Sequence, residues 1–423
     1  MKNSISLTLI LLLASTLSQG ADLTLDTCLK RARVNYPLSK QSDLIARSES
    51  YSIDNAYRGY LPQLYIVGHA SYQSEVTEVP VRIPGFSFEP LSKDQYRIHA
   101  ELNQMIYDGG SMGKQSTIAS ANAAVSKEQL EVELNKLRDR VQNLYFGILL
   151  LSEQIEQIRL KIADIDATIS SVRGAVENGA ALKSTLALLE AESLTARQKQ
   201  IGLRSSRQSY AAMLGMLIGT QVDTTTRLIR PGDIPLSDTI RRPELPLFAA
   251  QQEAITARKE LITTRYIPRI SAFATGGYGR PGLDMLKNEF RPFYIVGLRL
   301  NWQLTDLYAS SSEQDLLEVE QATIGVQRET FLLNTRVTMT QQRQEITTYD
   351  EMLRLDDEIV NKRSSVLASS KAQVENGTRT AHDYMRDLND LDVARRDRSF
   401  HAIQRDLTIH MHASTTGTTG DRP

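Results

Sequence analysis

The stretch LEVELNKLRDRVQNLYFGILLLSEQIEQIRLKIADIDATISSVRGAVENG, residues 130–179, carries apolar residues at alternating spacings of four and three. The resulting period of 3.5 residues is typical of a left-handed coiled coil rather than of an ordinary globular helix. Because no proline lies between Pro90 and Pro231, the pattern predicts one helix from about Lys114 to Val176, roughly 95 Å long at 1.5 Å per residue. The seam comprises Leu130, Leu134, Leu137, Val141, Leu144, Ile148, Leu151, Ile155, Ile158, Ile162, Ile165, Ile169, Val172 and Val176.

The last four residues of this stretch, VENG at 176–179, recur at 374–377, which is 198 positions later. The repeat is much larger than four residues, because YRIHAELNQ at 96–104 corresponds to YIVGLRLNW at 294–302 with the same offset. Asn-Gly is a typical helix stop and tight reversal, and in both copies a second periodic segment follows it. The sequence therefore predicts a duplicated unit in which each VENG is the tip of a long helical hairpin.

The duplication defines the expected organisation of the chain. An apolar run near the start, followed by small residues, is typical of a secretory signal peptide. The expected parts are a signal peptide at 1–20, a first repeat at 21–219, a linker at 220–243, a second repeat at 244–412 and a disordered tail at 413–423. The first repeat should contain strands at about 61–73 and 95–107 and a hairpin at about 114–218 whose tip is 178–182. The second should contain strands at about 267–278 and 293–304 and a hairpin at about 309–410 whose tip is 376–380.

The second copy of the long helix keeps a seven-residue apolar step from Leu332 to Val374, but its other seam positions are polar. We expect these polar positions to face a wetter or less tightly packed surface than the first seam does. They are Thr335, Gln342, Asp356 and Arg363.

Two segments, Tyr96–Ile106 and Tyr294–Leu304, alternate between apolar and polar residues with the period of two that predicts β-strands. Two further strands are expected to begin near Pro62 and Pro268. Four strands cannot close a membrane barrel alone, since the smallest such barrels need about eight. Strands from several copies of the chain would therefore have to share one barrel.

Composition narrows the class of protein further. A formal net charge of −1 argues against binding to nucleic acid. No uninterrupted apolar stretch of 18 residues follows the first twenty, so no transmembrane helix is expected, which leaves periplasmic, secreted or β-barrel destinations. Cys28, the single cysteine, is either a lipid anchor or a small apolar residue on a helix face with Leu25, Leu29 and Ala32.

The chain resembles TolC-type outer-membrane efflux proteins. The resemblance rests on the duplicated order of helix, strand, strand and long hairpin, and on three motifs: LTLDTCLKRARVNYP at 23–37, RPEL at 242–245 and VENGTRT at 374–380. It implies a homotrimer in the bacterial outer membrane, with a twelve-stranded barrel in lipid above a periplasmic α-helical tunnel. It further implies a tunnel that stays closed until a periplasmic adaptor protein and an inner-membrane pump dock.

The resemblance also implies three sets of functional residues. A charge on the lipid side of a barrel costs roughly 2–4 kcal/mol near the midplane, so the polar strand residues should face the lumen. Three copies of Asp383 around one axis would repel each other, which favours bound cations or raised pKa values. The expected sets are Arg97, His99, Glu101, Asn103, Arg299, Asn301 and Gln303 in the lumen; Gly179, Ala180, Gly377 and Thr378 as adaptor-docking tips; and Arg379, Asp383 and Asp387 as the gate.

The gate departs from the family pattern at two positions. The family's second aspartate falls at Arg386 and the tyrosine expected before the turn at Val374, so Asp387 is an uncertain substitute in the ring of aspartates.

Other functions compete with an export channel. A secreted or periplasmic coiled-coil scaffold would explain the heptads but would leave four amphipathic strands without a purpose. An enzyme is disfavoured, because the chain has no HExxH, no GxSxG and no phosphate-binding glycine loop. We expect no cofactor and no metal, since His-Met-His at 410–412 suits a helix end better than a metal site. The cargo stays open between drugs, metal ions and secreted polypeptides.

Overall fold

A computed structural model describes residues 22–77, 90–179, 181–223, 226–376 and 378–418. The chain divides into two compact units, and the long helices α3 (Ser111–Glu177) and α6 (Asp306–Glu375) each contribute to both. The first unit consists of Met1–Lys40, Leu130–Pro243 and Thr330–Pro423, and the second of Gln41–Gln129 and Glu244–Glu329. Within the described ranges, no helix is both long and apolar enough to cross a membrane.

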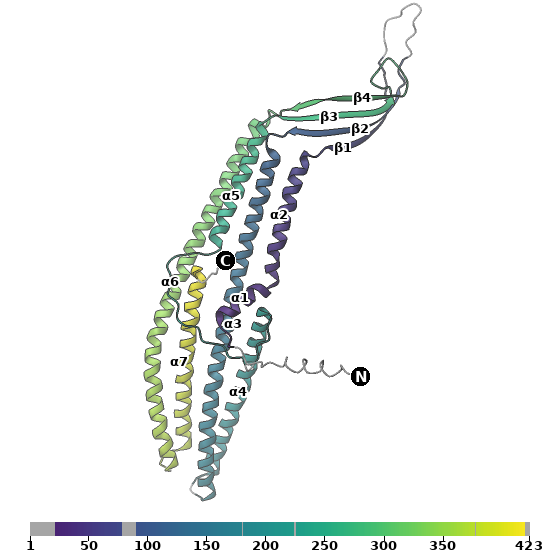
Figure 1. Ribbon diagram of the computed structural model, residues 1–423. Helices are drawn as coiled ribbons and strands as arrows, with labels where there is room; N and C mark the ends of the chain where they lie inside the picture. The colour runs from purple at the N-terminus through teal and green to yellow at the C-terminus, as the bar shows by residue number, and fades with distance from the viewer. Residues whose placement is uncertain (1–21, 78–89, 180, 224–225, 377, 419–423) are drawn as a thin grey trace, which may run out of the picture. The chain divides into compact units, whose positions relative to one another are not determined.

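The second unit contains a four-stranded antiparallel sheet in the order β1-β2-β3-β4, together with helices α2 (Gln41–Tyr57) and α5 (Glu244–Thr263) (Figure 1). Short 3₁₀ turns, η2 (Arg58–Tyr60) and η3 (Thr264–Tyr266), lead from these helices into the sheet. The central pair, β2 with β3, joins the first copy of the repeat to the second. The strands are β1 (Gln63–Tyr72), β2 (Asp94–Tyr107), β3 (Arg269–Arg280) and β4 (Arg291–Asn301).

The last strand ends earlier than its alternating pattern predicts. β4 stops at Asn301, so Gln303, which was expected on a strand, lies outside it. The indole N–H of Trp302 donates to the Tyr266 carbonyl at 3.1 Å, in η3, instead of continuing the strand pairing. An alternating pattern of apolar and polar residues can therefore extend beyond the residue at which the strand itself ends.

A buried carboxylate begins α3 directly after β2. The side chain of Asp108 accepts hydrogen bonds from the backbone N–H groups of Gly110 (2.9 Å) and Met112 (2.6 Å) and from the Tyr60 hydroxyl (2.6 Å). Burial by itself raises the pKa of Asp108, but these hydrogen bonds outweigh it and lower the pKa overall. The same bond raises the pKa of Tyr60 to about 12. Asp108 thus satisfies helix N–H groups that would otherwise be unpaired.

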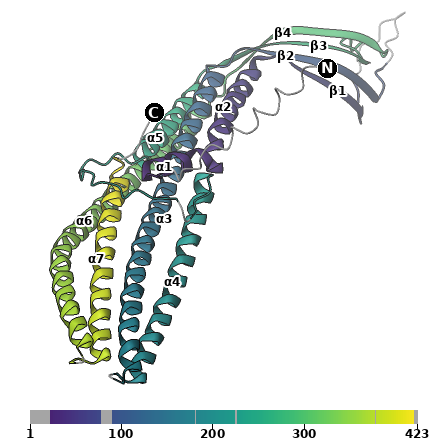
Figure 2. The ribbon, with the colours of Figure 1, turned by 60° about the horizontal axis from the view of Figure 1, so that its bottom comes forward.

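The first unit consists of two helical hairpins, α3 with α4 (Lys183–Ile218) and α6 with α7 (Ala381–Thr416), and of the short helix α1 (Leu25–Asn35). Figure 2 shows the two members of each hairpin side by side. Two apolar cores hold the unit together. The linker-side core is centred on Cys28, Leu137, Val141, Tyr145, Phe146, Ile148, Leu214 and Ile403, and the tip-side core on Ile158, Ile162, Ile165, Ile169, Val172, Leu189, Tyr384 and Leu388.

Burial confirms the seam of α3. Val141, Ile148 and Ile165 have no exposed surface, and most other seam positions are buried as well. The expectation for the second seam is wrong at two positions, because Thr335 and Asp356 of α6 are also buried. Polar partners explain this burial: the imidazole of His401 on α7 lies 2.7 Å from the Asp356 carboxylate, and the Thr335 hydroxyl donates to the Phe331 carbonyl of its own helix at 2.8 Å. Buried polar groups are tolerated where such partners satisfy them.

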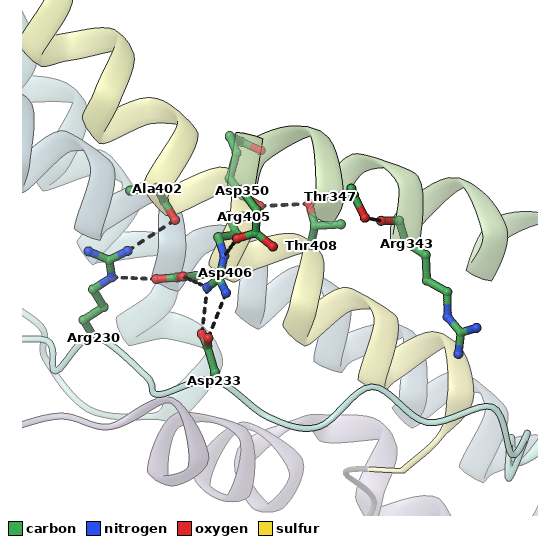
Figure 3. A network of polar contacts seen from close by, with 10 residues as sticks. Arg230, Asp233, Arg343, Thr347, Asp350, Ala402, Arg405, Asp406 and Thr408 are labelled. Atoms are coloured by element: carbon green, nitrogen blue, oxygen red, sulfur yellow. Dashed lines mark hydrogen bonds and ion pairs between the residues drawn. The ribbon is translucent and has the colours of Figure 1, made fainter. Parts of the chain in front are cut away.

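The linker is attached to the second hairpin by a polar network (Figure 3). The guanidinium of Arg405 on α7 binds both carboxylate oxygens of Asp233 in the linker at 2.8 Å, and also Asp350 of α6 at 2.5 Å. Arg230, also in the linker, binds the buried Asp406 at 2.5 Å. Paired, bidentate arginine contacts of this kind fix geometry as well as adding stability.

The C-terminal prediction requires a correction. The disordered tail was expected from 413, yet α7 continues to Thr416, and Ala413, Ser414 and Thr416 are buried. Gly417 ends the helix with φ at 74°, and its N–H donates to the Ala413 carbonyl at 2.9 Å. The linker supplies a further reason, because Arg241 N–H donates to the Thr416 carbonyl at 2.6 Å. The first residues expected in the tail therefore form a capped helix end.

Cys28 occupies the helix face that the apolar interpretation predicts. Its thiol is free and wholly buried with Leu25 and Ala32, and burial raises its pKa to about 12. The hydroxyl of Tyr145 lies beside it and makes contacts of 2.7 and 2.6 Å with the carbonyls of Leu23 and Ile229. These two hydrogen bonds join the start of the described chain to the linker, and the surrounding residues leave the Cys28 thiol inaccessible.

Candidate functional site

The two faces of the sheet differ in chemistry. In an antiparallel sheet, residues paired directly across strands lie on the same face. The pairs Leu64 with Leu102 and Ala274 with Val296 belong to one face, which is apolar along the four strands except for Asp94, Gln104 and Arg280 near the strand ends. The neighbouring pairs, such as Tyr65 with Glu101, belong to the other face.

The apolar face carries large side chains that nothing in the described chain covers. Tyr294 is 78% exposed and Leu298 72%, although a soluble domain would bury such residues. The same face also holds Leu64, Ile66, Ile98, Leu102, Val296 and Leu300, which are all exposed.

Six of the seven residues expected in the lumen share the opposite, polar face. Arg97, His99, Glu101 and Asn103 alternate along β2, and Arg299 and Asn301 lie on β4. The guanidinium of Arg299 comes within 3.6 Å of the Glu101 carboxylate across β3, so both side chains project from the same side. Gln303, which follows β4, is not part of this set.

Aromatic rings hold two of these arginines against the sheet. The guanidinium of Arg97 lies over the Phe293 ring, 5.6 Å from its centroid, and that of Arg299 lies over Phe273 at 4.9 Å. Both rings rest on glycine: a Cβ at Gly277 would lie 2.8 Å from the Phe293 ring, and one at Gly297 would lie 3.0 Å from Phe273. A side chain at either position would press on the ring of the adjacent strand, and at Gly277 it would also clash with the His99 Cβ and the Ile98 carbonyl, each 2.5 Å away.

Sequence reasoning missed further members of the polar face. Arg269 pairs with Asn301 and Arg291 pairs with Gly279, so both arginines project on the polar side. β3 extends two residues beyond its expected end and β4 begins two residues before its expected start. The sequence contained only a weak signal for Arg291: it lies an even number of residues before Arg299, but Phe293, Ile295 and Gly297 stand between them on the same face.

Both hairpin tips are exposed where the structure describes them. Gly179 has φ at 73°, a left-handed conformation that glycine adopts without strain, and its N–H donates to the Val176 carbonyl at 3.1 Å. Thr378 donates from its N–H (2.9 Å) and its hydroxyl (3.1 Å) to the Gln373 carbonyl. Ala180 and Gly377, the other two expected docking residues, lie outside the described residues.

The three expected gate residues lie close together at the start of the returning helix of the second hairpin, with Arg379 just before α7 and Asp383 and Asp387 within it. The guanidinium of Arg379 forms an ion pair with Asp387 at 2.6 Å, and the Asp387 carboxylate is almost wholly buried. Thr380 caps the start of α7: its hydroxyl accepts from the Asp383 N–H at 3.2 Å and donates to the Asp383 carboxylate at 2.7 Å. That carboxylate lies 3.8 Å from Arg386.

The electrostatics of Asp383 differ from the expectation for a ring of repelling carboxylates. Within one chain, the hydrogen bond from Thr380 and the nearby Arg386 and Arg379 hold the pKa of Asp383 below its usual value. The carboxylate is therefore charged and half-buried in the single chain.

Comparison with known proteins identifies the class to which this fold belongs. Residues 29–220 match the model of the family described as outer membrane efflux protein. AprF, the alkaline protease secretion protein of Pseudomonas aeruginosa, is 23% identical over 291 residues, which make up 66% of this chain and 59% of AprF. The chain therefore spans less than two thirds of the length of this relative.

Solved structures share the fold over nearly their whole length. The outer-membrane channel OprN superposes with a TM-score of 0.68 at 12% identity, covering 93% of this chain and 89% of OprN. CusC, described in connection with transmembrane channel formation, superposes with a TM-score of 0.69 at 13% identity, covering 94% and 92%. The fold is that of outer-membrane channel proteins. The chain is thus similar to outer membrane efflux proteins in the sequence of residues 29–220, and it shares the fold of outer-membrane channels.

Proposed function

We propose that three copies of the chain form an outer-membrane channel, which conducts substrates from an inner-membrane pump and a periplasmic adaptor to the cell exterior. Each copy contributes four strands to one twelve-stranded barrel, and the hairpins form a periplasmic tunnel with its gate at the tips. AprF is described as a secretion protein, so a secreted polypeptide stands among the cargo classes beside drugs and metal ions.

The observation that carries the proposal is an apolar sheet face combined with two unpaired edges. β1 and β4 are the edge strands, and neither has an outer neighbour among the described residues. Backbone N–H and C=O groups exposed to lipid must be hydrogen-bonded, which in a sheet requires closure. Pairing β4 of one copy with β1 of the next continues the antiparallel alternation and satisfies both edges.

The facing of the strands can be tested with a matched pair of cysteines, because Leu298 and Arg299 are adjacent and lie on opposite faces. In the assembled protein, Arg299→Cys should react with a membrane-impermeant, water-soluble maleimide. Leu298→Cys should react only with a lipid-soluble reagent. The native Cys28 is a useful background, since its thiol is buried and free.

The same preparation tests the channel itself. Purified protein should remain a trimer in detergent and should produce discrete conductance steps in planar bilayers. A coiled-coil scaffold without channel activity would give no steps, and its residues 298 and 299 would both react with the water-soluble reagent. That combination of results would exclude the channel.

A further inference from the structure

The polar face of the sheet has a strong imbalance of charge. Along the four described strands it holds four arginines, whereas the carboxylates on this face are limited to Glu101. Asp94, at the start of β2, belongs to the opposite face, where it binds Arg280. The four arginines are Arg97, Arg269, Arg291 and Arg299.

Two of these charges have no counter-charge in the described chain. Neither Arg97 nor Arg269 forms an ion pair with any residue that the structure describes, and both are exposed. Arg299 shares the carboxylate of Glu101 at 3.6 Å, which is longer than a hydrogen bond. Arg291 is the best compensated, since Glu289 in the preceding loop binds it at 3.0 Å.

Two of the four arginines share one row across the sheet, and aromatic rings restrict the position of two of them. Strand pairing aligns His69, Arg97, Gly279 and Arg291 in one row across the sheet, towards the ends of the strands that adjoin the β1–β2 and β3–β4 loops. Arg299 and Arg269 lie near the opposite ends of the strands. Because Arg97 rests on Phe293 and Arg299 on Phe273, their guanidinium groups have little freedom to turn away from the wall.

We propose that these arginines make the barrel section of the channel attract anions, and that the chemical class of solute it favours is anionic. The inference rests on the proposed function, because it requires the polar face to line the pore. Fixed charges of one sign along a narrow passage concentrate counter-ions within it and exclude ions of the same sign. Repeated in three copies, the row that contains Arg97 and Arg291 becomes a ring of positive charge, and Arg269 and Arg299 add further positive charge near the other end of the strands.

Ion selectivity measured in planar bilayers tests the inference, with potassium and chloride as the probes. The reversal potential across a KCl gradient should give the ratio of chloride to potassium permeability for the wild type and for two double variants. Arg97→Gln with Arg299→Gln removes two charges per copy. Arg97→Lys with Arg299→Lys keeps the charges and is the matched control for the loss of the arginine shape.

The neutral double variant should lower the chloride-to-potassium permeability ratio at least about twofold, while the lysine double variant stays close to the wild type. The difference should shrink in 1 M salt, where the screening length is about 3 Å, compared with about 10 Å in 0.1 M salt. Channels whose permeability ratio is the same in all three proteins at low salt would overturn the inference and leave the channel function intact. A wild type that forms no channels would instead overturn the proposed function, and the inference with it.

Discussion

At the scale of single residues, His412 is the most unusual side chain in the first unit. It has no exposed surface, and neither ring nitrogen has a hydrogen-bond partner among the described residues. Burial lowers its pKa, Arg343 lowers it further, and Asp238 acts in the opposite direction. The neutral imidazole is therefore the form that the folded chain prefers.

This preference predicts a loss of stability in acid. A histidine with a depressed pKa in the folded state leaves stability intact above its unfolded pKa, about 6.5, and lowers it as the pH falls below that value. The melting temperature should fall between about pH 8 and about pH 5, and the fall should be smaller in His412→Leu. His382→Leu is the control, since His382 lies exposed on the same helix. An equal fall in the wild type and in His412→Leu would contradict the prediction.

At the scale of elements, a polar layer links α3, α4 and α7 at the level where the tip-side core begins, around Ile158 and Ile162. The ammonium of Lys161 on α3 binds Asn389 of α7 at 2.6 Å and Glu192 of α4 at 3.2 Å. Gln157, one turn earlier, donates to Ser399 at 2.5 Å. Polar groups at one level of a helical seam fix the register of the helices, because a shift would leave them unpaired.

Removing the central cation of this layer should therefore weaken the packing of three helices at once. Lys161→Ala should lower the free energy of unfolding by about 1–3 kcal/mol, since it leaves largely buried polar groups without a partner. Lys136→Ala is the matched control on the same helix: its ion pair with Glu133 is exposed, and such pairs contribute about 1 kcal/mol at most. Chemical unfolding followed by circular dichroism compares the two. Similar losses in both variants would show that the layer is only a solvated surface.

The elements also show which features a sequence can predict. The buried seam of α3 could be predicted because it packs against apolar partners and because its own residues repeat at the spacing of a coiled coil. Two polar seam positions of α6, Thr335 and Asp356, were misassigned; burial of Asp356 depends on its partner His401, 45 residues away along the chain. Alternation predicted that Arg97 and Arg299 lie on the polar strand face. The stacking of arginines on aromatic rings, and the place of Arg269 on the polar face, could be predicted only from the register between strands. Alternation within one strand does not contain that register.

At the scale of the whole molecule, the proposed gate depends on how the second hairpin is held. The sequence suggested Arg379 and Asp383 as the key residues and left Asp387 uncertain. The structure brings Arg379 to Asp387 instead, eight positions along the chain, and buries the carboxylate. That pair ties the tip turn to the returning helix α7, because Arg379 precedes the helix and Asp387 lies within it. The role of all three residues in gating stays a prediction.

Breaking the pair should favour the open channel. Arg379→Ser leaves the Asp387 carboxylate buried without its cation, which costs the closed arrangement about 1–3 kcal/mol unless the hairpin moves and exposes it to water. We expect the hairpin to move so that this carboxylate reaches water, and the substitution should then raise single-channel conductance in planar bilayers. Arg386→Ser removes the same charge from the start of α7, but Arg386 is exposed and its contact with Asp383 is a long one at 3.8 Å, so the conductance of this variant should stay near the wild-type value. Equal conductance in Arg379→Ser and the wild type, or equal gains in both variants, would show that this ion pair does not hold the gate.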